Sequence, residues 1–174
     1  MLNIIFIHGL ESSGHGFKAK LLKNKIPEII TPDFEEYIPG TPNKNLLERR
    51  MTQLEKIITG EKSWIIIGSS FGGLMAVLFT CKKSEKVKGL ILLAPYLNSP
   101  ELNPKHFSGL PLNIPVFIFH ARNDLVVPMK PSKARAEKIF SNIEYHIIEN
   151  DDHKLESTVQ KMDWNDLINK IENP

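Results

Sequence analysis

The segment from Gly68 to Gly72 constrains the fold of this chain more than any other stretch. It reads Gly-Ser-Ser-Phe-Gly, follows the apolar run 65–67 and precedes the apolar run 74–79. The first run is typical of a buried strand and the second of a buried helix. Glycines on both sides of a serine therefore indicate a crowded strand-to-helix turn. Ser70 has glycine at the required spacing on both sides, so we expect it at the rim of a sheet.

Short β-rich runs alternate with helical patterns along the chain, as is typical of a parallel sheet covered by helices on both faces. The runs that predict strands are residues 3–7, 29–32, 64–67, 89–93, 116–119 and 144–148. The patterns that predict helices are residues 16–24, 43–59, 70–82, 131–140 and 156–171. We therefore predict the α/β class, as a three-layer α/β/α sandwich with about six mainly parallel strands.

Two of the expected helices differ in their apolar pattern. In the helix 43–59 one face is expected to be core and the other charged, because a helical period relates Leu46, Leu47, Arg50, Leu54, Ile57 and Ile58. The helix after Ser70 is apolar nearly all round and is predicted to be central. Its N-terminus directs a partial positive charge toward the turn.

The length and composition favour one globular domain. The 174 residues suffice for one well-packed domain and are too few for two ordinary ones, so we expect a single domain over residues 1–174. The chain is 41% hydrophobic and 24% charged, which are globular values. Its net charge is +2 with scattered lysines. That pattern favours solvated helix faces over nucleic-acid binding.

The N-terminal sequence and the cysteine content bear on the compartment. The apolar run 2–7 is far shorter than a membrane span and lacks the flanks of a signal peptide, so it is predicted to be a strand. Cys81 is the only cysteine, which makes an intramolecular disulfide impossible and fits a reducing compartment. We expect Cys81 to be a small buried hydrophobe and the protein to be cytoplasmic, without membrane insertion.

A serine hydroxyl becomes a good nucleophile only when a base removes its proton. Asp124 follows the predicted strand 116–119, and His153 follows the last predicted strand. The order serine, acid, histidine is the order of one well-known triad arrangement. We predict that His153 accepts the Ser70 proton and that Asp124 fixes the imidazole tautomer and stabilises its protonated form.

Negative charge on a reacting carbonyl oxygen requires backbone N–H donors in a fixed geometry. One expected donor is the amide of Phe71, directly after Ser70. The second expected donor is the amide of Leu10, in the loop that follows the first strand and begins His8-Gly9. A His-Gly pair suits this place, because glycine lets the backbone turn its N–H toward the site.

These residues together resemble the α/β-hydrolase superfamily. The resemblance rests on HGLESSG at residues 8–14, on GSSFGG at 68–73, on the Asp124 loop and on the late His153. More narrowly, the chain resembles the small esterases of the YqiA type that lack a cap domain. This likeness implies a minimal α/β-hydrolase fold and hydrolysis of carboxylic esters or thioesters. It also implies Ser70, Asp124 and His153 as the triad, with no metal and no organic cofactor.

The segment 95–113 falls where larger relatives insert a cap domain. About twenty residues can hold only short helical turns, so we expect an open active site. Tyr96, Leu97, Leu102, His106 and Phe107 are either a hydrophobic wall for an acyl chain or packing under a loop. We also expect contact with substrate from His8, Gly9, Tyr96 and Leu97.

Several other residues invite a functional interpretation that the sequence does not favour. Ser69 is interpreted as a small filler, and Asp33 is a second candidate for the acid that breaks the expected order. His15 is expected to cap a loop or helix, His120 to brace the acid loop, and His146 to be structural. Asp151-Asp152-His153 lacks the further ligands that a metal site requires.

The leading function is a serine hydrolase that cleaves small or medium acyl esters through an acyl-enzyme intermediate. A thioesterase of the same mechanism stays open, as does a non-catalytic binding protein on the same fold. A peptidase or amidase is a weaker alternative, because amines leave poorly. The expected partner is a small-molecule ester or thioester.

Overall fold

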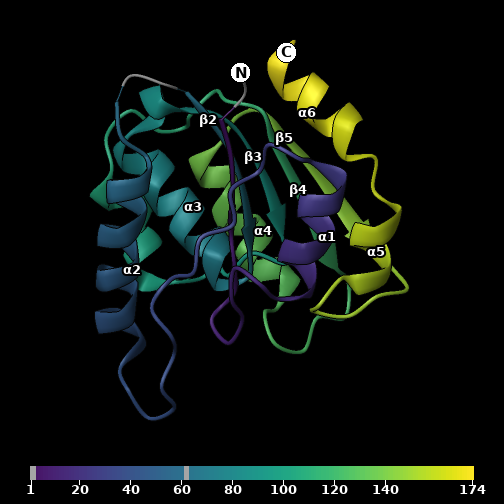
Figure 1. Cartoon of the computed structure of the whole chain (residues 1–174). Coiled ribbons are helices and arrows are strands. Elements are labelled where there is room, and N and C mark those ends of the chain that lie inside the picture. The colour runs from purple at the N-terminus through teal and green to yellow at the C-terminus, as the bar shows by residue number, and fades with distance from the viewer. Residues whose placement is uncertain (1–2, 61–62) are drawn as a thin grey trace.

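The computed structural model describes residues 3–60 and 63–174, and within them one parallel sheet of five strands runs through the molecule (Figure 1). The strands lie side by side in chain order. They are β1 (Asn3–Ile7), β2 (Trp64–Ser69), β3 (Val87–Leu93), β4 (Val116–Ala121) and β5 (Ile143–Ile148). Parallel strands need crossover connections, which in the described part of the chain contain α-helices between β1 and β2, β2 and β3, and β4 and β5, and only two short 3-10 helices between β3 and β4.

Helices cover both faces of the sheet and complete the three-layer α/β/α sandwich that the sequence predicts. The α-helices within the described residues are α1 (Phe17–Lys25), α2 (Asn43–Ile57), α3 (Phe71–Lys82), α4 (Met129–Ile139), α5 (Glu156–Lys161) and α6 (Trp164–Glu172). One core cluster joins the sheet to α2, α3 and α4, and the other joins it to α1, α5 and α6. Figure 1 shows α1, α5 and α6 on one side of the strands. None of these helices, in the part of the chain that is described, is long and apolar enough to cross a membrane.

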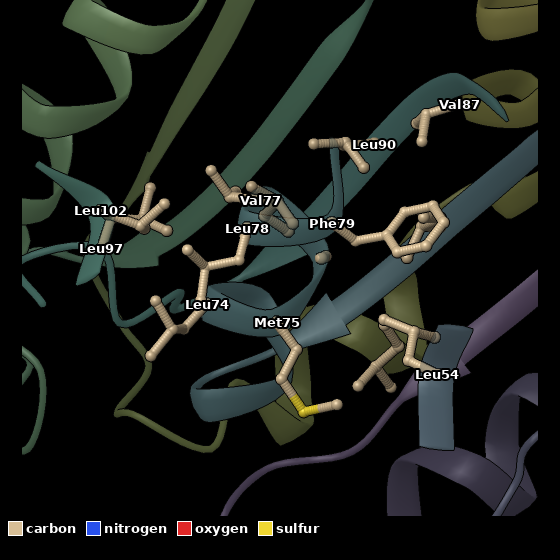
Figure 2. Packing of buried hydrophobic residues seen from close by; sticks show 14 of the residues in the cluster. Leu54, Leu74, Met75, Val77, Leu78, Phe79, Val87, Leu90, Leu97 and Leu102 are labelled. Atoms are coloured by element: carbon tan, nitrogen blue, oxygen red, sulfur yellow. The ribbon is translucent and has the colours of Figure 1, made fainter. Parts of the chain in front are cut away.

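The helix α3 is the centre of the first core cluster. Ten of its twelve residues are buried, from Phe71 to Thr80. Figure 2 shows Leu74, Met75, Leu78 and Phe79 of this helix packed among side chains from the sheet, from α2 and from the segment after β3. A helix that is apolar all round is stable only when it is surrounded, so the turn that feeds it is fixed by the core.

All five strands deliver their following loops to one edge of the sheet. Ile7 is in register with Gly68, Ser69 with Leu93, and Ala121 with Ile148. The loops after β1, β2, β3, β4 and β5 therefore begin at similar heights. In open parallel sheets this carboxyl edge is where ligands bind.

Most predicted elements differ from the structure by one or two residues at an end, and three differences have a clear physical reason. Residues 29–32 do not form a sixth strand, because only Ile30 pairs with β1, through one isolated bridge. Pro27 and Pro32 lack the N–H that a longer ladder needs. The predicted helix 156–171 is two helices, since Asp163 accepts the Asp166 amide at 3.0 Å and starts α6 afresh. The helix α4 begins two residues before the predicted 131, because proline is tolerated in a first turn, where N–H groups have no helical acceptor.

Candidate active site

Ser70 lies on a strained turn between β2 and α3. Its backbone has φ 53° and ψ −114°, a conformation that L-residues rarely adopt. The Ser70 amide donates to the Leu93 carbonyl of β3 at 2.9 Å. The Ser70 carbonyl accepts from the Gly73 amide at 3.0 Å and from the Tyr96 amide at 3.0 Å. These bonds to both neighbouring elements hold the unfavourable conformation and leave the side chain at the sheet edge.

The glycines around Ser70 are required by close backbone contacts. A Cβ on Gly72 would lie 2.1 Å from the Ile7 carbonyl oxygen of β1. A Cβ on Gly68 would lie 2.7 Å from the Gly72 carbonyl oxygen. Both distances are well below van der Waals contact with backbone atoms that cannot rotate away. The sequence predicted this crowding.

We expect Gly72→Ala to destabilise the protein by about 3 kcal/mol or more, because the added methyl group would force β1 and α3 apart. Urea unfolding measures this loss. Gly9→Ala is the matched control, since a Cβ at Gly9 would make only ordinary contacts of 3.6 Å. Equal stability of the two variants would contradict the crowded packing of the turn.

A hydrogen-bonded chain runs from Ser70 through His153 to Asp124. The Ser70 Oγ lies 3.0 Å from His153 Nε2, and His153 Nδ1 lies 2.7 Å from Asp124 Oδ2. The carboxylate accepts from Nδ1–H, which leaves Nε2 without a proton and able to accept from the serine hydroxyl. The structure thus brings together three side chains from the loops after β2, β4 and β5. The arrangement can withdraw a proton from Ser70.

The Asp124 carboxylate is buried and fully engaged as an acceptor. Its Oδ1 accepts the amides of Val126 and Val127 at 2.9 and 2.8 Å, and its Oδ2 faces His153. His120 Nε2 lies 3.3 Å from the same Oδ2 and 2.9 Å from the Val127 carbonyl oxygen. Because the carbonyl only accepts, Nε2 carries the proton, and the Tyr145 hydroxyl donates to His120 Nδ1 at 2.8 Å. His120 therefore braces the acid loop, in the role that the sequence favoured.

The loop that carries His153 is anchored on both sides. Leu155, two residues later, is fully buried in the second core cluster and has φ 53°. Asp151 accepts both the amide and the hydroxyl of Thr158 in α5, at 2.8 and 2.7 Å. The imidazole is held at the sheet edge with its side chain 19% exposed.

The two backbone amides predicted to bind an oxyanion lie in the loops next to Ser70. Phe71 is the first residue of α3, and Leu10 follows the His8-Gly9 pair after β1. A Cβ on Gly9 would lie 3.6 Å from Ser70 Cβ, so this loop passes against the serine. Among the described residues neither the Leu10 nor the Phe71 amide donates to a protein acceptor. Both N–H groups are therefore free for a ligand.

Two of the residues expected to contact substrate have buried side chains. His8 is 1% exposed, and its Nε2 accepts the Phe34 amide at 3.0 Å while Nδ1 lies 2.8 Å from the Gly9 carbonyl oxygen. Leu97 is fully buried in the core. These two side chains hold loops in place and do not face a substrate. Tyr96 is 36% exposed directly after β3, and Gly9 lies against Ser70.

Of the two alternatives left open for residues in 95–113, the structure favours packing for Leu97, Leu102, His106 and Phe107 over a hydrophobic wall beside Ser70. Leu102 is buried, and the Arg135 guanidinium of α4 donates to its carbonyl oxygen at 2.6 Å. His106 and Phe107 line a groove of about 730 Å³ with residues of α2 and with Leu78 of α3. Leu78 is eight residues beyond Ser70, or roughly 12 Å along the helix. Residues 100–107 of the segment therefore pack over α2 and α3, whereas Tyr96 stays beside Ser70, whose carbonyl oxygen accepts the Tyr96 amide at 3.0 Å.

Burial lowers the pKa of His8 and of His120 below the ordinary value of 6.5. Each ring is held neutral, with one nitrogen donating and the other accepting. A histidine whose folded-state pKa is lowered binds fewer protons than the unfolded chain does. The stability that each neutral histidine contributes is therefore fully present when the pH is above the unfolded pKa of 6.5, and it is lost as the pH falls below that value.

We expect the free energy of unfolding to fall as pH is lowered from 7 to 5, by up to about 1.4 kcal/mol per pH unit for each of these histidines. Urea unfolding at several pH values gives the slope. His120→Gln, whose side chain cannot titrate, should show a shallower slope than the native chain. His106→Gln alters an exposed histidine and should keep the native slope. Identical slopes in all three proteins would contradict this interpretation.

One buried residue near the site was not assigned a role from the sequence. Arg50 occupies a core-facing position of α2 and is 0% exposed, and its guanidinium donates to the carbonyls of Gly9 and Leu10. The sequence does place this charged residue on the face of the helix that the apolar period assigns to the core. Its partners are backbone atoms some forty residues away, which no side-chain pattern reveals.

Comparisons with known proteins support the fold. No curated protein sequence matches the chain. Among solved structures, an esterase from Exiguobacterium antarcticum (EaEST) superposes with a TM-score of 0.76 at 14% identity, over 99% of this chain and 92% of that one. The esterase Est1E from Butyrivibrio proteoclasticus, with ferulic acid bound, gives 0.69 at 16% identity, over 99% and 90%. Mouse alpha/beta hydrolase domain-containing protein 10 gives 0.72 at 18% identity, over 98% and 87%.

These identities are too low to transfer a substrate, and they show a shared fold over nearly the whole chain. The model of the alpha/beta hydrolase family matches residues 24–170, which include the strand-to-helix turn, the Asp124 loop and the His153 loop. The predicted fold class is thereby confirmed, and the chain belongs to the alpha/beta hydrolase family.

Proposed function

We propose that this hydrolase cleaves small or medium acyl carboxylic esters with Ser70 as nucleophile, His153 as general base and acid, and Asp124 as the residue that orients His153. The observation that carries the proposal is the connected chain at 3.0 and 2.7 Å from Ser70 Oγ to Asp124 Oδ2. The hydrogen bonds are oriented so that His153 can accept the Ser70 proton while Asp124 stabilises the protonated imidazole. More narrowly, we propose an esterase similar to the YqiA type.

The chemistry proceeds in two halves. The Ser70 oxygen attacks the ester carbonyl carbon while His153 Nε2 takes the hydroxyl proton, and the carbonyl oxygen becomes an oxyanion facing the amides of Leu10 and Phe71. The tetrahedral species collapses, the alcohol leaves with the proton from His153, and an acyl-serine remains. Water then attacks the acyl group in the same way, with His153 again taking and returning the proton, and the acid is released.

The surroundings of the triad favour an open site for modest acyl groups. Leu125 and Val126 follow Asp124 directly and are 95% and 67% exposed. Tyr96, which follows β3, is also partly exposed. These apolar side chains on the loops that carry the site offer a shallow rim. Residues 100–107 pack over α2 and α3, so we propose that the segment 95–113 adds no lid over Ser70.

A panel of p-nitrophenyl esters and acyl thioesters of graded chain length tests the proposal. We expect Ser70-dependent turnover that is highest for short and medium acyl esters. Faster cleavage of acyl-pantetheine thioesters than of the matched oxygen esters would make the protein a thioesterase. Absence of Ser70-dependent turnover on every member would contradict the proposal of a hydrolase of this class.

A further inference from the structure

Arg50 is a buried cation that bonds three backbone carbonyl groups. Its Nε donates to the Glu35 carbonyl oxygen at 2.7 Å, and its terminal nitrogens donate to Gly9 and Leu10 at 3.3 and 3.0 Å. The neighbouring Arg49 is half exposed and pairs with the Glu35 carboxylate at 2.8 Å. Two adjacent arginines thus reach the same residue, and only the buried one reaches on to the loop beside Ser70.

Removing a guanidinium from water costs free energy, so packing alone does not explain why this position of α2 carries an arginine. Burial lowers the pKa of Arg50 to about 10, which still leaves the side chain charged at neutral pH. Replacing a buried charged group by a well-packed apolar one is frequently neutral or stabilising. We therefore infer that the charge of Arg50 has a role other than packing.

Arg50 bonds the carbonyls on both sides of the Leu10 amide and, together with His8 and the Ser12 amide, holds the orientation of the Gly9–Leu10 peptide. The peptide is trans, so its carbonyl and its N–H point in opposite directions. The Gly9 carbonyl accepts from His8 Nδ1–H at 2.8 Å and from Arg50 at 3.3 Å. With this carbonyl held toward His8 and Arg50, the Leu10 N–H is held facing the other way. The Gly9 carbonyl also accepts the Ser12 amide at 3.4 Å, so a peptide flip would break three bonds and take this acceptor from the buried His8 and Arg50 donors.

The same guanidinium also lies against the side chain of Phe71, whose amide is the other expected donor. The Arg50 guanidinium carbon is 5.6 Å from the centroid of the Phe71 ring, within the range of a cation–π contact. Phe71 is itself buried and begins α3. Arg50 therefore contacts both residues whose amides are the expected oxyanion donors.

We propose that Arg50 is a positioning residue that fixes the Leu10 amide, through the Gly9 and Leu10 carbonyls, in the orientation that binds the oxyanion of the reaction. The inference rests on the proposed function, since it assigns a role within that reaction. Arg50 does not touch the substrate. It acts on the second oxyanion donor, and the Ser70–His153–Asp124 chain does not depend on it.

The test is steady-state hydrolysis of a short p-nitrophenyl ester by Arg50→Met and Arg50→Lys. Losing one oxyanion donor typically costs about 10²–10³ in kcat, so we expect Arg50→Met to lose about 10²-fold in kcat. We expect KM to change less than about threefold, and the pH at half-maximal rate to stay unchanged because the proton relay is intact. Arg50→Lys keeps the positive charge but loses the planar guanidinium group that bonds several acceptors at once. Its kcat should therefore lie between the native and Met values.

Chemical rescue separates positioning from stability. Millimolar guanidinium should restore part of the kcat of Arg50→Ala, because the free cation can occupy the vacated place and bond the same carbonyls. The matched control is Arg49→Met, which removes a cation one position away on the same helix and should keep the native kcat. Melting temperatures of all variants show that the compared proteins are folded.

Several outcomes would overturn the inference. They are a native kcat in folded Arg50→Met, a loss confined to KM, a shifted pH profile, or unfolding of both the Met and the Lys variants. Failure of the proposed function is separate, because it would show as absence of Ser70-dependent hydrolysis by the native protein. In that case the rate at which a fluorophosphonate labels Ser70 still measures the effect of Arg50, since the phosphonyl oxygen uses the same donors.

Discussion

Replacing Ser70 by alanine is expected to lower ester turnover by about 10⁶-fold, leaving only the residual catalysis by binding and the oxyanion donors. The substitution removes only the Oγ that lies 3.0 Å from His153 Nε2. Without it no acyl-enzyme forms, and His153 has no nucleophile to activate. The turn keeps its backbone bonds to Leu93 and Gly73, so we expect the variant to fold as the native chain does.

Ser69→Ala is the matched control for this prediction. Ser69 is the adjacent residue at the end of β2, is buried, and pairs in register with Leu93. Its loss should leave turnover within about threefold of the native rate, since the buried Ser69 side chain makes no hydrogen bond to Ser70, His153 or Asp124 among the described residues. Kinetics with p-nitrophenyl acetate compare the variants. Comparable losses in both, or a native rate in Ser70→Ala, would remove Ser70 from the role of nucleophile.

Replacing Asp124 by asparagine is expected to lower turnover by about 10⁴-fold with the fold retained. The amides of Val126 and Val127 both donate to Oδ1, so the new side chain must keep its oxygen there. Its NH₂ group then falls at the place of Oδ2, 2.7 Å from His153 Nδ1. Two donors cannot face each other, so Nδ1 must lose its proton and Nε2 must carry one. The imidazole can then no longer accept the Ser70 proton.

Asp33→Asn tests the second candidate acid and serves as the control. Asp33 accepts the Gly14 amide at 2.6 Å and pairs with His15 at 3.0 Å, on exposed side chains. It is therefore engaged away from His153, and its substitution should cost less than about threefold in turnover. A large loss in Asp33→Asn together with a native rate in Asp124→Asn would exchange the two roles.

The sequence predicted the features that depend on local patterns and on chain order. The apolar run, the glycines and the serine at 68–72 specified a crowded turn, and the structure shows backbone atoms where any Cβ would fall. The positions of Asp124 and His153 after successive strands predicted that both would reach the same edge as Ser70. The parallel sheet alone enforces that convergence, since each strand ends there.

The features that the sequence missed depend on contacts across the fold. Residues 29–32 have strand-like composition, yet Pro32 has no N–H to donate to β1 and Thr31 Oγ1 bonds the Gly14 carbonyl, so that only Ile30 bridges to β1. Substrate contact was expected from His8, but its ring is turned into the protein by the Phe34 amide. Arg50 has backbone partners, and backbone acceptors leave no trace in the identity of the residues that carry them.

The most direct test of the central claim is labelling by a fluorophosphonate probe followed by peptide mass spectrometry. Ser70, activated by His153 and oriented by Asp124, should form a covalent adduct in the native protein, and the labelling rate should fall sharply in Asp124→Asn. An unmodified Ser70 after long exposure of the folded native protein, or an adduct on another residue, would contradict the account.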